Sequence, residues 1–492
     1  MAEEKEKVHW TYWLHLAIGA FFMFGFPMFD PIEPLTEIGM TIVGVFVGMV
    51  YLWSALDSIW PSLLGLLLVA IAGYIPDMTG YAAVKQLFLE AFGSETVVVC
   101  ILGMVLFAGV EFVGCTKYMA RFFMSIKALE GKPYVFLYIF FVGAYFISGL
   151  TSPLASMLIM WPIAQEVCAT YGYKKGDKVF ALMICGVYLA STLGQPMLPF
   201  KGASYIVISA YMNMSGAVIN FGSYILYTIV MSLMLLAFFL VFVRFVYRPD
   251  VEAIKRVTVA ELTKEKLPPM NIQQIAFLLM LVAYVVLLLM PNFLPKTIPF
   301  VKFINDIGIL GLTIIFIVIL MVIPYKGKPM LDFKAVAKKS FSWDIMFLVA
   351  AAMYVCTAMS SNVTGVKPFL VQILSPLLGD KPVIIFVLLI LAFAVTTTNF
   401  ANNAGMAVVL LPVILSFAEF YPTANMNALA ITVVLAVFVA LLTPAASPYC
   451  GMLHARRDLV SYGEILQLFV PMFFIALISY TFIGYNIASM LF

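Results

Sequence analysis

Two apolar segments far apart in the chain share one layout, in which polar residues, glycine or proline interrupt the middle of the segment. One covers residues 133–162 and is interrupted at Ser152-Pro153, and the other covers residues 382–412 and is interrupted at Asn402-Asn403. Each interruption begins ten positions before the closing proline (162 − 152 and 412 − 402). Irregular backbone inside a bilayer is tolerated only where protein or a water-filled cavity solvates it. A matched pair of such segments in two halves of a chain indicates the binding site of a secondary transporter.

The composition excludes a soluble protein. The chain has 492 residues, of which 64% are hydrophobic and 11% charged, and its mean hydropathy is +1.06. Soluble domains carry about 25% charged residues. A membrane span needs roughly 20 apolar residues, and we count eleven such segments besides the two interrupted ones. The predicted fold class is an all-α polytopic membrane protein with about 11 transmembrane helices plus two re-entrant hairpins.

The distribution of Lys and Arg predicts the orientation. If both interrupted segments turn back on themselves, 22 of the 28 Lys and Arg residues fall on one side, which is then the cytoplasmic side. The N-terminus is expected in the cytoplasm and the C-terminus outside the cell membrane. The first hairpin then enters from the cytoplasm and the second from outside, which makes the two halves an inverted repeat. Two ordinary helical hairpins that cross the membrane fully give the same charge distribution and remain an alternative.

The predicted organisation follows these features. Its parts are N-terminal scaffold helices (1–92), a first repeat (93–247) with a hairpin (133–170) and a broken helix (179–211), a cytoplasmic linker (248–271), scaffold helices with an interfacial segment (272–340), and a second repeat (341–492) with a hairpin (382–420), a broken helix (428–453) and a last span.

A helix interrupted by proline is expected after each hairpin, at Gln195-Pro196 and at Ser447-Pro448. Proline lacks a backbone donor and clashes with the preceding turn, so carbonyls and amides are freed there. Freed carbonyls can coordinate a cation, and helix N-termini can hold an anion. Two hairpin tips facing two broken helices predict a site in the middle of the membrane. The alternative is that these prolines only kink their helices.

Enzyme chemistry finds no support in the sequence. The six cysteines lie singly in or beside apolar segments, and the three histidines are scattered without metal-ligand spacing. A phosphate-binding glycine loop and a nucleophile elbow are also missing. We predict no enzyme activity, no resident cofactor and no nucleic-acid partner. The predicted partners are a small anionic substrate and the lipid bilayer.

These features resemble the divalent anion:sodium symporter family (solute carrier family 13 and its bacterial relatives). The resemblance covers nearly the whole chain and is carried by the segment 52–64, by Pro162 and Pro412, and by both broken helices. It implies an elevator-type secondary transporter that forms a homodimer through its scaffold helices. It further implies symport of a small organic anion, such as a dicarboxylate, with sodium as a coupling ion.

The resemblance also implies site residues by position. The substrate would contact Ser152, Gln195, Asn402, Asn403 and Ser447. A first sodium site would involve Ser148, Thr151, Pro153 and Gly194, and a second would involve Thr398, Ala401, Asn403 and Ala446. The family carries an asparagine where this chain has Pro153, so the first site lacks one amide ligand.

Lys201 follows the first broken helix and has apolar runs on both sides. An ionisable residue within a span indicates function. Its ammonium either attracts an anionic substrate or replaces a bound sodium ion, which would leave transport coupled to protons or to exchange. The alternative is a structural pairing with Glu111 or Glu166.

Two other function classes remain open. The same fold can serve as a cation/proton antiporter, or the chain can be a non-transporting membrane subunit or receptor that kept the scaffold. Sodium-stimulated uptake of an anion separates the leading hypothesis, a secondary active anion transporter driven by a sodium or proton gradient, from both.

Overall fold

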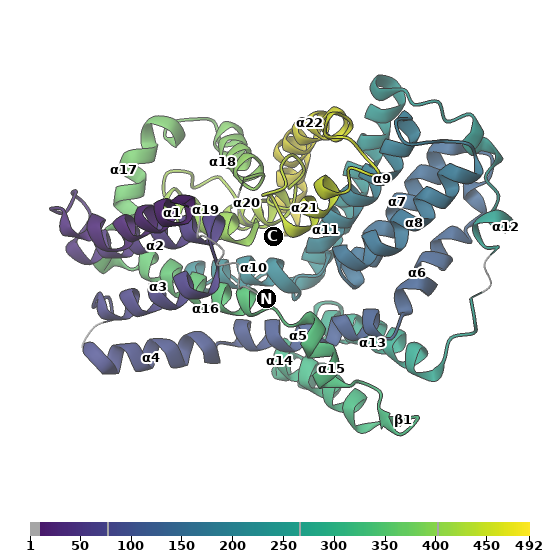
Figure 1. Cartoon of the computed structure of the whole chain (residues 1–492). Helices are drawn as coiled ribbons and strands as arrows, with labels where there is room; N and C mark the ends of the chain where they lie inside the picture. Colours follow the sequence, from purple (N-terminus) through teal and green to yellow (C-terminus); the bar gives the residue numbers. More distant parts are fainter. Residues whose placement is uncertain (1–9, 76–77, 265–266, 401–402) are drawn as a thin grey trace, which may run out of the picture.

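The computed structural model of the chain is almost entirely helical and describes residues 10–75, 78–264, 267–400 and 403–492 (Figure 1). The label η marks short 3₁₀ or π turns. The first half contains α1 (Trp10–Ala20), η1 (Phe21–Gly25), η2 (Phe26–Met28), α2 (Glu37–Ala55), α3 (Ile59–Ile71), α4 (Gly80–Gly93), α5 (Glu95–Phe112), α6 (Cys115–Met124), η3 (Lys127–Leu129), α7 (Pro133–Leu150), α8 (Pro153–Thr170), α9 (Lys178–Gly194), η4 (Gln195–Met197), α10 (Gly202–Ser215), α11 (Phe221–Phe242) and η5 (Val243–Tyr247).

The second half follows the linker. It contains η6 (Ala253–Arg256), α12 (Val259–Leu262), α13 (Ile272–Phe293), α14 (Pro299–Val322), β1 (Pro324–Tyr325), β2 (Lys328–Pro329), α15 (Phe333–Ser340), α16 (Trp343–Ser360), η7 (Asn362–Thr364), α17 (Val366–Leu378), α18 (Val383–Thr397), α19 (Asn403–Ser416), α20 (Met426–Ala436), α21 (Pro448–Ala455), α22 (Tyr462–Ser479), η8 (Tyr480–Gly484) and α23 (Tyr485–Leu491). The strands β1 and β2 form one short antiparallel hairpin.

The helices confirm the predicted membrane fold. Within the described residues, ten helices are long and apolar enough to cross a bilayer, and the pair α17–α18, bent by 106°, brings the number to as many as eleven. Side-chain caps set where several of them begin, since they satisfy the backbone amides that the first turn leaves free. Asn271 with Gln274 starts α13, and Ser461 with Glu464 starts α22, each pair as a capping box.

Both interrupted segments form helical hairpins. In the first, α7 ends at Leu150 and α8 begins at Pro153. In the second, α18 ends at Thr397 and α19 begins at Asn403. The first hairpin packs on α9 and the second on α20, while α22 contacts both α9 and α18 and so joins the two halves (Figure 1).

The broken helices differ in how well the sequence predicted them. The first, predicted over 179–211, is α9 followed by η4 and α10, with the break where Pro196 was expected to make it. The second, predicted over 428–453 with a proline-bearing break across residues 441–451, consists of α20 and α21, and its non-helical part is longer than expected because α20 already ends at Ala436. Helix α3 has only 13 residues, fewer than the roughly 20 that a full membrane span needs.

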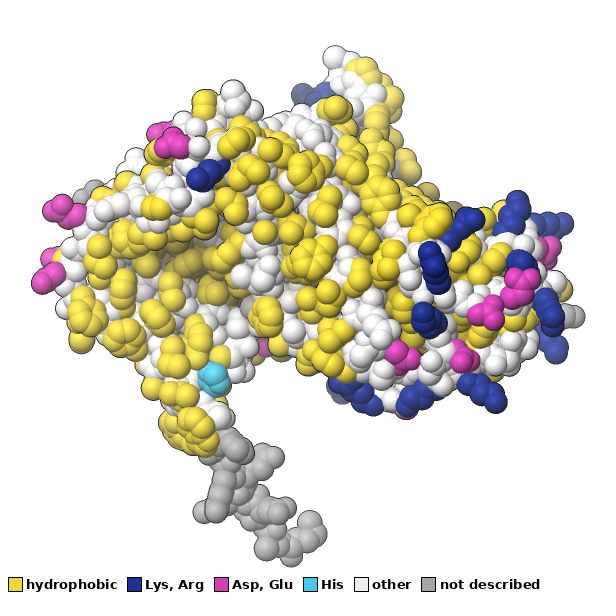
Figure 2. Space-filling view, turned by 90° about the horizontal axis from the view of Figure 1, so that it is seen from above, with side chains coloured by type: hydrophobic (Ala, Val, Ile, Leu, Met, Phe, Trp, Pro, Cys, Tyr) yellow, Lys and Arg dark blue, Asp and Glu magenta, His cyan; other side chains and the backbone are white. Residues whose placement is uncertain are grey.

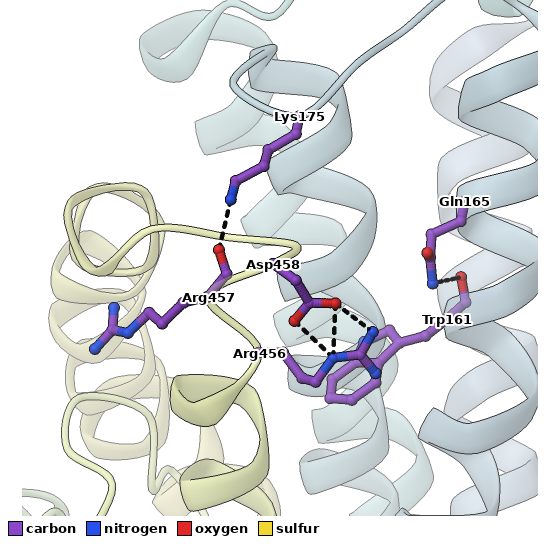
Figure 3. Close-up of polar contacts among 6 residues, drawn as sticks. All are labelled: Trp161, Gln165, Lys175, Arg456, Arg457 and Asp458. Carbon is purple, nitrogen blue, oxygen red and sulfur yellow. Dashed lines mark hydrogen bonds and ion pairs between the residues drawn. The ribbon is translucent and has the colours of Figure 1, made fainter.

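Charge and apolar surface separate along the molecule. Figure 2 shows apolar side chains over the middle of one face and most Lys and Arg side chains at one end. A hydrogen bond joins the loop between α8 and α9 to the loop between α21 and α22, and a salt bridge lies within the second of these loops (Figure 3). Lys175 Nζ donates to Arg457 O at 2.6 Å, and the Arg456 guanidinium pairs with Asp458 at 2.7 Å, which holds the pKa of Asp458 below its usual value.

Candidate functional site

A cavity of about 500 Å³ lies at the tip of the first hairpin. Its walls come from α5, the hairpin tip, the break between α9 and α10, α15, α16 and α21. The polar side chains that line it are Glu111, Thr151, Ser152, Gln195, Lys201, Lys339, Ser340 and Tyr449. Ser152, Gln195 and Lys201, which the sequence predicted as substrate contacts, therefore line one cavity.

Helix N-termini surround this cavity. Pro153 begins α8 and lines it, Gly202 begins α10 and lines it, and Tyr449 enters it from the first turn of α21. The first turn of a helix exposes backbone N–H groups and the positive end of the helix dipole. Three such ends at one cavity favour a negatively charged ligand.

Ser152 and Ser447 have the same local role. Ser152 Oγ accepts from Ala155 N at 3.1 Å, and Ser447 Oγ accepts from Cys450 N at 3.1 Å. Each serine is a helix N-cap followed by proline at the first helical position, which is the preferred arrangement at a helix start. The two serines thus fix the N-termini of α8 and α21.

Glu111 was not among the predicted site residues, yet it lies in the cavity. Ser152 Oγ donates to Glu111 Oε2 at 3.0 Å, so a carboxylate from α5 contacts the hairpin tip. The signal in the sequence was an acidic residue in the last turn of an apolar helix, far from Glu95 at its start.

Lys201 contacts the hairpin through backbone carbonyls. Its Nζ donates to Ser148 O at 3.1 Å and to Gly149 O at 3.0 Å, both in the last turn of α7, and lies 6.0 Å from the centre of the Phe107 ring. Among the described residues, no ion pair within 4.0 Å joins Lys201 to Glu111 or Glu166. Glu166 lines a different cavity, beside α6 and α12. Lys201 therefore makes no direct ion pair with either carboxylate, although Glu111 lines the same cavity and acts on the ammonium electrostatically.

Hydroxyl groups of α11 satisfy the carbonyls freed at the first break. Tyr224 OH donates to Pro196 O at 2.8 Å, Thr228 Oγ1 donates to Met197 O at 3.1 Å, and Ser232 Oγ donates to Leu193 O at 3.4 Å. Because the alternative is an unpaired carbonyl in an apolar interior, each contact helps to hold the break open.

The residues of the predicted first sodium site do not fit a bound sodium ion. The Ser148 and Thr151 hydroxyls donate to the carbonyls of Ser191 and Ile147, which leaves only their oxygen lone pairs for a cation. Pro153 has no side-chain ligand, and the carbonyls of Ser148 and Gly149 accept from Lys201. Gly194 supplies space instead of a ligand, since a Cβ there would stand 2.3 Å from Tyr145 O.

The second break is filled by a residue that the sequence analysis did not place in the site. The fully buried Asn399 accepts from Leu441 N at 2.8 Å and from Leu442 N at 2.7 Å through Oδ1, and its Nδ2 donates to Val439 O at 3.2 Å. Thr398 donates to Val437 O. These contacts explain why α20 ends at Ala436. The side chains of the hairpin tip bond the backbone amides and carbonyls after Ala436, which would otherwise need helical partners.

Oxygen atoms gather at the predicted second cation site. Thr398 Oγ1 lies 2.9 Å from Asn403 Oδ1 and also contacts Val437 O. Ala446 is buried in the non-helical segment before α21, and Ala401 and Asn402 lie outside the described residues. Hydroxyl, amide and carbonyl oxygens are ligands that a hard cation accepts. This donor set fits a sodium ion.

The cavity accounts for part of the predicted site. Ser152, Gln195 and Lys201 line the cavity, whereas Asn403 and Thr398 belong to the second tip, whose described residues do not line it. Asn402, the predicted contact at the second tip, lies outside the described residues, so the convergence of both tips on one cavity stays a prediction. Ser447 connects the two regions, because it ends the segment held by Asn399 and caps the helix that brings Tyr449 to the cavity.

Known proteins share this architecture. An uncharacterized transporter of Haemophilus influenzae is 20% identical over 466 residues, which cover 92% of this chain and 93% of the relative. An uncharacterized transporter of Methanocaldococcus jannaschii is 20% identical over 359 residues, covering 70% and 74%. The crystal structure of the Alcanivorax borkumensis YdaH transporter aligns with a TM-score of 0.56 and 13% identity, covering 91% of this chain and 98% of that one. This likeness concerns the fold.

The family comparison agrees with the resemblance found in the sequence. The model of the sodium:sulfate symporter transmembrane region matches residues 6–486, nearly the whole chain. Together with the relatives, it indicates a multi-pass membrane transporter. The chain belongs to the sodium:sulfate symporter family.

Proposed function

We propose that this protein is a secondary active transporter of a small organic anion, coupled to a sodium or proton gradient. The observation that carries the proposal is the cavity at the first hairpin tip, where three helix N-termini and the Lys201 ammonium lie around one space of about 500 Å³. We expect the protein in the cell membrane with its N-terminus in the cytoplasm, as the lysine and arginine distribution predicts.

A carboxylate is the ligand that suits this cavity best. Backbone N–H groups at the starts of α8 and α10 can donate to carboxylate oxygens, and the Gln195 amide adds a neutral donor. Ser152 donates its only hydroxyl hydrogen to Glu111, so a bound anion would have to compete with that carboxylate. The substrate is therefore expected to form its strongest contacts with the helix ends and Gln195.

Coupling is assigned to the second hairpin tip. Thr398, Asn403 and Val437 would hold a sodium ion there, whose charge would stabilise the negative C-terminal end of α18. The hairpins with their broken helices would then move against the remaining helices as an elevator, and those remaining scaffold helices would form the homodimer contact that the family resemblance implies.

Ligand-dependent thermal stability tests the proposal. A ligand that binds only the native protein stabilises it by about 2.7 kcal/mol at a concentration one hundred times its Kd. We expect at least one mono-, di- or tricarboxylate to raise the melting temperature of the purified protein in sodium, and to do so less in potassium. Gln195→Ala should weaken this shift.

The other outcomes of the same measurement are informative. Stabilisation by an anion that is equal in sodium and potassium would retain the anion site and replace sodium coupling with protons or exchange. If carboxylates, sulfate and phosphate all leave the melting temperature unchanged, the proposal fails. A cation/proton antiporter or a non-transporting subunit would then be the better hypothesis.

Asn403→Ala is expected to abolish the sodium dependence of anion binding, because it removes one of the oxygen atoms beside Thr398. Isothermal titration of the carboxylate found in the panel, with and without sodium, measures the effect. Asn305→Ala is the matched control, since Asn305 is an exposed amide on α14. Unchanged sodium dependence in Asn403→Ala would remove that residue from the cation site.

A further inference from the structure

We infer that the Lys201 ammonium is a resident cation that takes the place of sodium at the first hairpin tip. The inference refines the proposed function by removing one of the two coupling cations that the family resemblance implies. The family resemblance implies a sodium ion at the first hairpin tip, and in this chain the side chain of Lys201 brings a positive charge to that tip.

The contacts of the ammonium are those of a cation at a helix end. Its Nζ lies 3.1 Å from Ser148 O and 3.0 Å from Gly149 O. These carbonyls are in the last turn of α7, where backbone carbonyls lack helical partners and the helix dipole is negative. A positive charge stabilises such an end, whether it comes from an ion or from a side chain.

The remaining expected ligands are turned away or missing. The hydroxyls of Ser148 and Thr151 donate to the carbonyls of Ser191 and Ile147, and Pro153 has no amide. A sodium ion would therefore find two carbonyls already held by the ammonium, a positive charge beside them, and no amide ligand at position 153. An ammonium needs fewer oxygen ligands than a sodium ion, because each of its three hydrogens requires one acceptor.

The position of Lys201 in the chain strengthens this reading. It belongs to the segment between η4 and α10, so its side chain bridges the first break and the hairpin tip. A bound sodium ion would have the same bridging role. Lys201 bridges the same two elements without binding an ion from solution. Its ammonium is part of the chain and cannot dissociate.

Truncation of the side chain tests the inference through stability alone, without a substrate or a transport assay. Lys201→Ala removes the ammonium and leaves room at the two carbonyls. We expect its melting temperature to fall by at least 5 °C in choline chloride, and sodium or methylammonium chloride to restore at least half of that loss. The wild-type protein without substrate should gain less than 2 °C from methylammonium.

Two further variants keep the test decisive. Lys339→Ala removes an exposed lysine of the same cavity, and it should neither lower the melting temperature nor respond to methylammonium. Lys201→Met keeps the length of the side chain without its charge, and serves if Lys201→Ala does not fold. We expect a loss of at least 5 °C that methylammonium does not restore, since the Met side chain fills the space.

The inference is overturned if Lys201→Met or Lys201→Ala has the same melting temperature as the wild-type protein. It is also overturned if Lys201→Ala has the same lowered melting temperature in choline, sodium and methylammonium chloride. Because these measurements contain no anionic substrate, they can fail while the anion panel succeeds. The reverse also holds, so the two proposals are separately tested.

Discussion

Asn399→Ala is expected to lower the free energy of unfolding by about 3 kcal/mol or more and to abolish transport. The variant would leave the amides of Leu441 and Leu442 and the carbonyl of Val439 without their side-chain partner. A buried backbone group that loses its partner costs about 1–3 kcal/mol. Thermal unfolding in detergent and uptake into proteoliposomes measure the two effects.

The control for this prediction is Asn305→Ala, which truncates an exposed amide outside the hairpins. It should unfold within 1 °C or so of the wild-type protein, since surface substitutions change stability by less than about 0.5 kcal/mol. If Asn399→Ala unfolds at the same temperature as the wild-type protein, the second break does not depend on the hairpin tip.

Gly194→Ala is expected to displace the first hairpin and to abolish anion binding in the cavity. A Cβ at this position would stand 2.3 Å from Tyr145 O, 3.0 Å from Ser148 Cβ and 3.1 Å from Gly149 N. Two of these three atoms are backbone, so α7 itself must move. Added volume in a tightly packed interior costs about 1–3 kcal/mol.

The measurement is anion-dependent stabilisation in this variant, with Gly103→Ala as its control. Gly103 lines the same cavity, but its nearest neighbour to an added Cβ is Phe200 O at 3.8 Å, an ordinary contact. Gly103→Ala should therefore keep the stabilisation that Gly194→Ala loses. Equal binding by both variants would show that the close approach of α7 and α9 does not shape the site.

The sequence allowed the hairpins and the breaks to be predicted because local chemistry determines them. Pro196 lacks a backbone donor and lies at the break between α9 and α10, and Ser152 and Ser447 beside prolines mark helix starts. Apolar length gave the spans in the same way, apart from α3. These features depend on neighbours in the chain, so one sequence is enough to find them.

The partners inside the site could not be predicted in this way. Asn399, Asn402 and Asn403 are close in sequence, and nothing local says that Asn399 is the one directed to the second break, whose backbone lies about 40 positions further on. Lys201 was recognised as unusual, but the carbonyls it contacts belong to residues 52 and 53 positions earlier. Such pairings arise from packing between distant segments.

The position of Lys201 has an electrical consequence. A sodium ion contributes its charge only while it is bound, whereas the ammonium belongs to the chain and is present when the carrier is empty. Moving one elementary charge through the whole field takes about 2.3 kcal/mol per 100 mV. In the proposed elevator, the membrane voltage would therefore act on the return of the empty carrier as well as on its loaded passage.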